Sequence, residues 1–235
     1  MMGHSHALSG ALVWLAAAPG LAALVPAAEH ATVPAELLAG ALVCAGAAML
    51  PDLDHPKATI AQTFGPVTWV LSRAVNGIAG GHRQATHSLL FCAVAGVGTH
   101  LLAQWHTVAR DVVVVLMIGL ALRALAVGVP RRTLTSAMLN VLLTTALAVI
   151  FHSFGVGYGW LGLAVAIGSL AHVVGDCLTE RGCPVLWPIK KRWLLPYKIG
   201  FKTGKWFEQR FLAPALSVGI VVLLYLRLMP EVTVG

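Results

Sequence analysis

Long apolar stretches alternate with shorter polar ones along this chain, and the pattern predicts a series of membrane-spanning helices. Each stretch comes close to the ~20 apolar residues that a helix needs to cross the hydrocarbon core of a bilayer. The seven predicted spans cover residues 7–25, 34–50, 88–105, 111–128, 134–151, 158–178 and 211–229. The sequence therefore predicts an all-α fold, a polytopic transmembrane helix bundle, with a single membrane-embedded domain over residues 1–235.

Composition supports a membrane protein and argues against a nucleic-acid partner. Of the 235 residues, 58% are hydrophobic and 11% are charged, and the mean hydropathy is +0.82. A soluble domain carries about 25% charged residues. In so apolar a chain, the formal net charge of +7 points to anionic lipid headgroups as partners. We expect the protein in the plasma (inner) membrane.

Basic residues gather on one side of the predicted topology. Seven spans place the N-terminus and residues 51–87, 129–133 and 179–210 on the same side. Of the 16 Lys and Arg residues, that side holds Lys57, Arg73, Arg83, Arg131, Arg132, Arg181, Lys190, Lys191, Arg192, Lys198, Lys202, Lys205 and Arg210. Arg110 and Arg227 lie on the other side. Because cytoplasmic loops carry an excess of Lys and Arg, this side is predicted to face the cytoplasm.

Histidines and aspartates gather on the same predicted side. Ionisable residues inside or beside apolar spans are costly and are usually retained for a function. The residues concerned are His6, Asp52, Asp54, His55, His82, His87, His172 and Asp176. Because imidazole and carboxylate groups are metal ligands, their convergence predicts a metal centre at the cytoplasmic face of the bundle.

The spacing of these residues indicates how they would meet. His172 and Asp176 are four residues apart, so a helix places both side chains on one face. Prolines at both ends of residues 51–56 disfavour a helix there, and an extended segment would point Asp52 and Asp54 to one face. Two such carboxylates repel each other unless a cation lies between them.

The segment before the third span carries two further histidines. His82 and His87 are five residues apart, which places His82 in the loop and His87 on the first helical turn. Ser88 or Thr86 is suited to cap that helix. Arg83 carries a forked, permanently charged guanidinium that suits a phosphate.

Three motifs together resemble a known family. They are Leu-Pro-Asp-Leu-Asp-His-Pro-Lys, His-Arg-x-x-Thr-His-Ser-Leu-Leu, and a His-x-x-x-Asp segment that continues to Leu-Trp-Pro. In this order they resemble the YdjM-like family of predicted membrane-bound metal-dependent hydrolases, from His6 to about Phe211. The His-x-x-x-Asp pair is also similar to the zinc-dependent phospholipase C and P1 nuclease group. The chain departs from the shorter family pattern around residues 106–156, which hold two additional apolar spans.

The same resemblance implies a role for Glu208. Family members carry a Gly and a following Glu at the place of Gly204 and Glu208, which makes Glu208 a candidate ligand. The alternative is an exposed Glu208 that pairs with Lys205 or Arg210.

The candidate ligands are too many for one tetrahedral ion, so two or more divalent ions that share carboxylates are expected. Paired ions clamp the attacking and leaving oxygens of a phosphoester. Nitrogen and oxygen ligands suit zinc first, and manganese or iron are also compatible. The candidate metal ligands are His6, Asp52, Asp54, His55, His82, His87, His172, Asp176 and Glu208, and the candidate catalytic residues are Arg83 and Asp54.

The predicted function is hydrolysis by metal-activated water, of a phosphoester in a membrane lipid or an amphipathic substrate. The alternative is a non-enzymatic membrane protein with a structural or regulatory metal site. Transport is a third option, but it requires polar residues through both halves of the membrane, whereas these cluster at one face. The sequence leaves the oligomeric state open.

Overall fold

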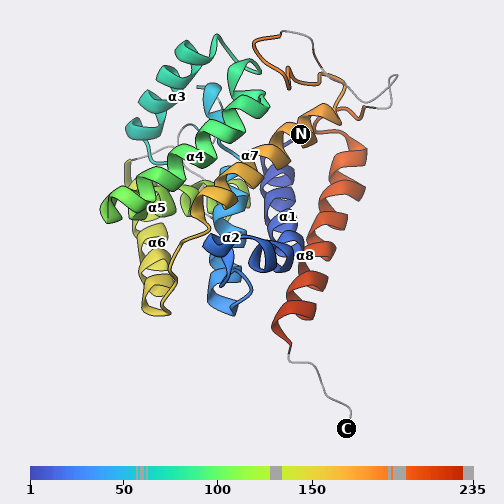
Figure 1. Ribbon diagram of the computed structural model, residues 1–235. Coiled ribbons are helices and arrows are strands. Elements are labelled where there is room, and N and C mark those ends of the chain that lie inside the picture. Colours follow the sequence, from blue (N-terminus) through green and yellow to red (C-terminus); the bar gives the residue numbers. More distant parts are fainter. Residues whose placement is uncertain are drawn as a thin grey trace.

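The computed structural model of the chain is built of helices (Figure 1), and it describes residues 1–56, 58, 61, 63–127, 134–189, 192 and 200–229. The α-helices are α1 (Gly3–Leu24), α2 (Pro34–Ala47), α3 (Pro66–Ala79), α4 (Leu89–Trp105), α5 (Thr107–Ala124), α6 (Leu134–Ser153), α7 (Leu161–Cys177) and α8 (Ala213–Leu228). Short turns of 3-10 helix are η1 (Pro26–Ala28), η2 (Pro51–Asp54) and η4 (Ala85–His87), and η5 (Glu208–Leu212) is a π-helical turn. The described residues form no strand, which confirms the all-α prediction.

Every predicted span contains a helix, but the helices differ in length and in apolar character. Four helical segments are long and apolar enough to cross a membrane: Gly3–Leu24, Pro34–Asp54, Leu134–Ser153 and Glu208–Leu228. Leu89–Trp105 and Leu161–Cys177 are apolar but shorter. The structure thus gives four candidate spans among the described residues, and the count of seven stays a prediction.

The third and fourth predicted spans, which leave residues 106–110 between them, are joined almost directly in the structure. His106 alone, with an extended backbone at φ −147° and ψ 113°, separates α4 from α5. Helix α5 therefore begins at Thr107, four residues before the predicted span, and ends at Ala124. Arg110 and Asp111, which sequence placed outside the helix or at its edge, pair with each other at 2.9 Å within its first turns.

Helix α2 is the centre of the bundle, because small residues let its neighbours approach closely. It packs against α1, α5 and α7. A Cβ on Gly46 would lie 1.8 Å from the Met117 carbonyl oxygen of α5, and one on Gly168 of α7 would lie 2.3 Å from the Cys44 carbonyl oxygen. Only glycine fits at such contacts, and close approach of small residues is how helices associate within a membrane.

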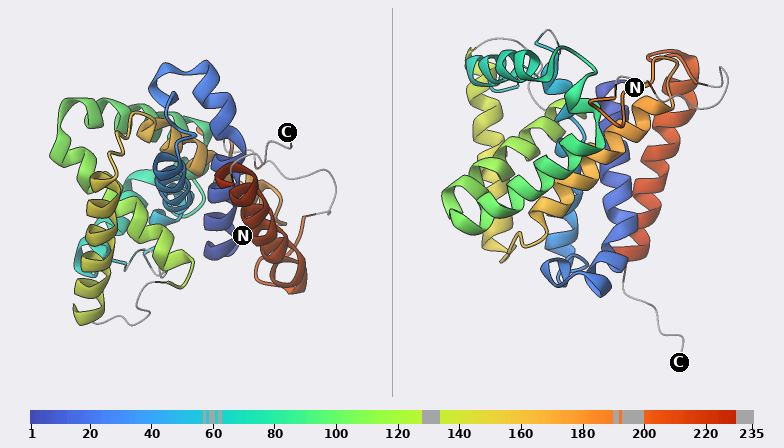
Figure 2. Two further views of the ribbon diagram at one scale, coloured as in Figure 1. Left: turned by 90° about the horizontal axis from the view of Figure 1, so that it is seen from below. Right: turned by 45° about the horizontal axis from the view of Figure 1, so that its top comes forward.

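Helix α3 was not predicted from the sequence. In Figure 2 it runs across one end of the bundle rather than alongside α1 and α8. Its exposed side chains include Val67, Val70 and Ile78, and the Arg73 guanidinium lies 4.5 Å from the centre of the Trp69 ring. An apolar face with interfacial Trp and Arg is typical of a helix that lies along a membrane surface.

Candidate metal centre

The predicted site residues meet at the end of the bundle where α1 begins and α7 ends (Figure 1). His6 lies in the first turn of α1, and His172 and Asp176 lie in the last two turns of α7. The turns η2 and η4 bring in Asp52, Asp54 and His87. Four segments that are distant in sequence thus supply one cluster, as the topology predicted.

Turn η2 directs its two aspartates differently from the extended segment that the sequence suggested. Pro51 begins a 3-10 turn and His55 ends it with an extended backbone. Because a 3-10 turn has about three residues per turn, side chains two positions apart diverge. The Asp52 Oδ1 atom lies 3.8 Å from Nε2 of His87, whereas Asp54 Oδ2 lies 3.4 Å from Nδ1 of the same ring. The expectation that both carboxylates share one face is therefore wrong.

Three ligand atoms lie close together, and a carboxylate oxygen of Asp52 lies beside them. The Nε2 atoms of His87 and His172 are 3.2 Å apart. Asp176 Oδ2 lies 3.5 Å from the first and 3.8 Å from the second, and Asp52 Oδ1 lies 3.8 Å from both. Ligands at ~2.0–2.1 Å from a tetrahedral zinc ion are separated by roughly 3.3–3.4 Å. The His87, His172 and Asp176 atoms are therefore spaced for three ligands of one tetrahedral ion, and Asp52 lies next to both imidazoles.

The outer nitrogen of each imidazole is held by a partner that fixes the ring. His172 Nδ1 lies 2.7 Å from the Ala48 carbonyl oxygen, so Nδ1 carries the proton and Nε2 presents its lone pair. His87 Nδ1 faces Asp54 Oδ2 and the Thr86 hydroxyl at 3.0 Å. Histidine ligands of metals are commonly oriented in this way by a carbonyl or carboxylate. Ala48 and Thr86 were not predicted, and a backbone carbonyl leaves no signal in the side-chain pattern.

Asp54 binds several residues of the loop that precedes His87. One oxygen accepts hydrogen bonds from the Arg83 backbone N–H at 2.9 Å and the Thr86 hydroxyl at 2.7 Å. The other lies 2.7 Å from His82 Nδ1. With both oxygens occupied and the side chain fully buried, Asp54 lies behind His87 as a positioning residue. The structure thus separates it from the ligand atoms described above.

Arg83 is tied to the opposite wall of the centre. Its backbone has φ of 60°, an unusual value for a residue with a side chain. This conformation lets the N–H reach Asp54 while an Nη atom lies 2.9 Å from the Asp176 carboxylate. A second Nη donates to the Gly182 carbonyl at 3.3 Å. Arg83 therefore fixes a candidate ligand as well as lining the space beside it.

His6 stacks on His172 without a hydrogen-bonded partner of its own. The ring centres are 3.7 Å apart and the planes differ by 14°. His6 is buried, and neither ring nitrogen has a hydrogen-bond partner among the described residues. Its Nε2 lies 3.4 Å from Asp176 Oδ1, which also accepts from the Met1 amino group at 2.6 Å. His6, Asp52 and His172 form a second possible ligand group.

His55 and His82 border a cavity of about 530 Å³ beside the centre. Their rings stack with centres 4.8 Å apart. Asp52, His82 and His87 form a further possible ligand group, which shares residues with the others. The other lining residues of the cavity are Met1, Asp52, Arg83, Thr179, Glu180, Arg181, Lys202 and Thr203.

Glu208 is buried, but it binds backbone rather than the cluster. One oxygen accepts from the Met2 N–H at 2.6 Å and the other from the Gly204 N–H at 2.7 Å. The side chain is fully buried, so the exposed, ion-paired alternative is wrong. Glu208 falls outside the possible ligand groups of the described residues and fastens the start of α1 to the start of α8.

The centre is rich in negative charge. Asp52, Asp54 and Asp176 surround His87, and burial opposes protonation of its ring. The neighbouring carboxylates of Asp52 and Asp54 outweigh burial and raise the pKa of His87 to about 9. A cation is therefore favoured beside this ring, whether a proton or a metal ion.

Comparison with known proteins gives one family. The sequence model described as "YdjM inner membrane protein" matches residues 1–126 and 123–231. The inner membrane protein YdjM of Escherichia coli strain K12 is 27% identical over 175 residues, which are 72% of this chain and 59% of that protein. The protein of the same name from Shigella flexneri aligns with the same figures.

The chain thus spans less than two thirds of the length of these relatives. No solved structure matches. The family match covers almost the whole chain, including every segment of the candidate metal centre, and the chain belongs to the YdjM inner membrane protein family.

Proposed function

We propose that this chain is a membrane-bound metal-dependent hydrolase that cleaves a phosphoester in a lipid or amphipathic substrate. The observation that supports it most is the convergence of His87, His172, Asp52 and Asp176 beside an open cavity. A structural metal site does not require an adjacent cavity, whereas a catalytic metal site needs space in which the substrate binds.

The donor set fits one divalent ion well and a second by sharing. His87, His172 and Asp176 would hold the first ion, and one of the two overlapping groups that contain Asp52, with His6 and His172 or with His82 and His87, would hold the second. Zinc is our first choice, with manganese or iron compatible. When bound, such ions supply a Lewis acid and a water of lowered pKa.

The cavity suits an anionic substrate. Arg83, Arg181 and Lys202 line it together, and the imidazoles of His55 and His82 face the same space. Guanidinium groups bind phosphate oxygens through paired hydrogen bonds. In the proposed reaction these cations bind and orient the phosphoester, and Arg83 also holds Asp176 in place. We place this face in the cytoplasm, following the distribution of Lys and Arg.

Burial favours the second candidate, a structural metal site. The side chains of His87 and His172 are fully buried and Asp176 is 1% exposed, while Asp52 is 21% exposed. Closed sites with four protein ligands are typical of structural zinc. In that case metal removal would unfold the protein and no substrate would be cleaved.

Metal analysis followed by a substrate screen separates these functions. Protein purified without chelators should contain at least two equivalents of divalent metal, and His172→Ala should lose much of it. His30→Ala is the matched control, since His30 is exposed and distant from the centre. Metal-free parent protein of normal stability would refute the metal centre.

The screen then uses phosphoester lipids with and without chelator. Chelator-sensitive release of phosphate or a phosphorylated headgroup supports the hydrolase. Metal-dependent folding with no cleavage of any lipid tested would favour the structural site instead.

A further inference from the structure

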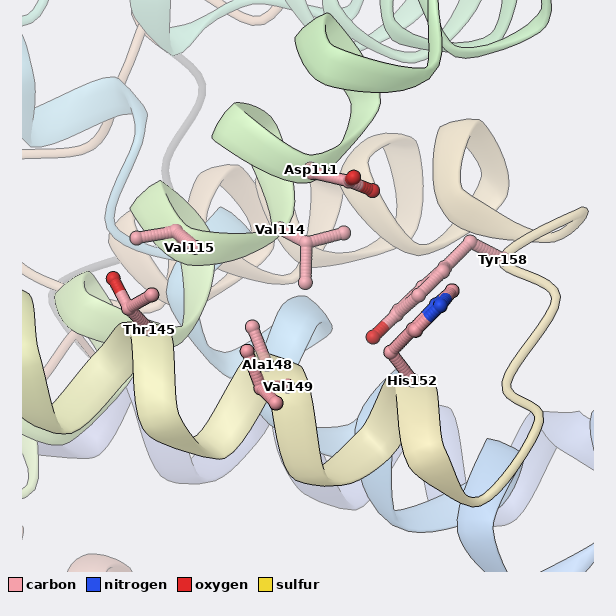
Figure 3. A pocket seen from close by; sticks show the side chains of 8 residues that line it. All are labelled: Asp111, Val114, Val115, Thr145, Ala148, Val149, His152 and Tyr158. Carbon is pink, nitrogen blue, oxygen red and sulfur yellow. The ribbon is translucent and has the colours of Figure 1, made fainter.

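A second polar cluster lies at the far end of α7 from the metal centre. Tyr158 precedes α7, whose 17 residues separate it from Asp176 by roughly 25 Å. Tyr158, Asp111 of α5 and His152 of α6 line a cavity of about 290 Å³ (Figure 3). The remaining lining residues are Val114, Val115, Thr145, Ala148 and Val149.

Tyr158 is held in a strained position with its hydroxyl unused. Its φ of 57° is rare for a bulky residue, and such strain is retained where the surroundings impose it. The residue is 4% exposed, and its hydroxyl has no hydrogen-bond partner among the described residues. Figure 3 shows the ring beside His152 with its oxygen directed into the cavity. A buried hydroxyl normally has a partner, so this one indicates a ligand.

Glu36 of α2 anchors the loop around Tyr158 through two hydrogen bonds. This buried carboxylate accepts from the Gly157 N–H at 2.7 Å and from Trp160 Nε1 at 2.5 Å. Tyr158 lies between these two anchored residues. The position of its hydroxyl is therefore fixed by the fold rather than by a contact of the hydroxyl itself.

An apolar cavity continues this one along α6. It measures about 580 Å³ and shares Asp111, Val115 and Thr145 with the smaller cavity. Its other walls are apolar side chains of α3, α5 and α6, among them Leu71, Leu116 and Val141. The two cavities together form a groove with one polar end, which we call the α5–α6 groove.

The length of the groove matches one leaflet of a membrane. From Val141 to His152 helix α6 advances about 16 Å, close to half of the ~30 Å hydrocarbon core. Helix α6 is itself a candidate span, and His152 lies one residue before its end. With α6 as a membrane span, the polar end lies near one end of that span, and the apolar end reaches the middle of α6 and the side chains of α3.

We propose that the α5–α6 groove binds one phospholipid that carries an ammonium in its headgroup, with an acyl chain along Val115, Leu116 and Val141. Asp111 is the one carboxylate among the lining residues of the smaller cavity; its Oδ1 atom pairs with the Arg110 guanidinium at 2.9 Å, and its Oδ2 atom receives the ammonium. The Tyr158 hydroxyl donates to a phosphate or ester oxygen of the same lipid. The site lies far from the metal centre and is independent of the proposed hydrolase function.

Native mass spectrometry of the full chain in detergent tests this proposal with two added lipids, phosphatidylethanolamine and phosphatidylglycerol. The parent should retain one phosphatidylethanolamine and bind phosphatidylglycerol at least tenfold more weakly. Tyr158→Phe removes only the hydroxyl and should weaken retention about tenfold. Asp111→Asn should abolish the preference between the two lipids.

Two filling variants test the groove itself. Val115→Trp and Thr145→Trp place an indole in it from α5 and from α6, and both should lose the lipid. Val222→Trp adds the same ring to an exposed position of α8 and should bind as the parent does. Thr145 is exposed, so Thr145→Trp decides the matter if Val115→Trp fails to fold.

Three outcomes overturn the proposal. They are a parent that retains no lipid, a Thr145→Trp variant that retains phosphatidylethanolamine, and equal binding of the two lipids by the parent.

Discussion

Replacing Asp54 by Asn tests whether metal binding depends on a carboxylate that positions the candidate ligand His87 without being a ligand itself. Asp54 accepts from the Arg83 N–H and the Thr86 hydroxyl, lies 2.7 Å from His82 Nδ1, and faces Nδ1 of His87. Asn keeps the shape but turns one acceptor into a donor. At least one buried donor then faces another donor, and His87 loses the charge that orients its ring.

The expected magnitude follows from these contacts. Loss of an outer partner of a ligating histidine typically weakens metal binding ~10–100-fold, which corresponds to roughly 1.4–2.8 kcal/mol. One unsatisfied buried donor should lower the free energy of unfolding of the metal-free protein by about 1–3 kcal/mol. Both effects are large enough to measure separately.

The assay is zinc titration of metal-depleted protein against a chelating dye, with thermal unfolding of the same samples. Asp52→Asn removes a candidate ligand and should weaken zinc binding further than Asp54→Asn. Glu29→Gln, at an exposed carboxylate of the loop after α1, is the control and should match the parent. Parent-like zinc affinity of Asp54→Asn would refute the reasoning, and a loss equal to that of Asp52→Asn would make Asp54 a ligand.

Three further predictions concern the surroundings of the centre. Arg83→Lys keeps the charge but loses the forked contact, so turnover of a validated substrate should fall by roughly 30–1000-fold with metal content retained; parent-like turnover would limit Arg83 to an anchoring role. Glu208→Gln places an amide donor against the N–H groups of Met2 and Gly204 and should lower the free energy of unfolding by about 1–3 kcal/mol, while loss of metal at unchanged stability would instead support a ligand role. Cysteines introduced at Lys57, Arg132 and Lys191, which lie outside the described residues, should resist an impermeant label added to intact cells, and labelling at any of them would break the predicted orientation.

The number and order of the apolar stretches were sufficient to predict where the candidate site residues meet. Hydropathy placed a helix in every apolar stretch, and the order of those helices was enough to bring His6, His87 and His172 to one end of the bundle. Ser88, predicted as a cap, accepts from the Phe91 N–H at 3.2 Å as the first residue before α4. The positions of the helices and the Ser88 cap depend on local sequence patterns, so a single sequence is enough to predict them.

The remaining features depend on contacts that periodicity does not encode. The amphipathic helix α3 lies within a segment that was treated as a loop, because its apolar residues alternate with polar ones and its mean hydropathy is lower than that of the spans. The different roles of Asp52 and Asp54 follow from a 3-10 turn. Pro51 and Pro56 are compatible with such a turn, but they do not distinguish it from an extended segment. Glu208 binds the Met2 backbone from the other end of the chain, a pairing without any local signature.

The scattering of Asp52, His87, His172 and Asp176 along the chain sets the order in which the centre is assembled during synthesis. Asp52 and His87 leave the ribosome well before His172 and Asp176, and at ~5–20 residues per second the interval between Asp52 and Asp176 is roughly 6–25 s. Until α7 is synthesised, the chain carries only Asp52 and His87 of these four residues, together with Asp54, the residue that positions His87. In the proposed metal centre, stable metal binding would therefore follow the packing of α7 against α2 and α4, so that metal capture would report complete packing of the bundle.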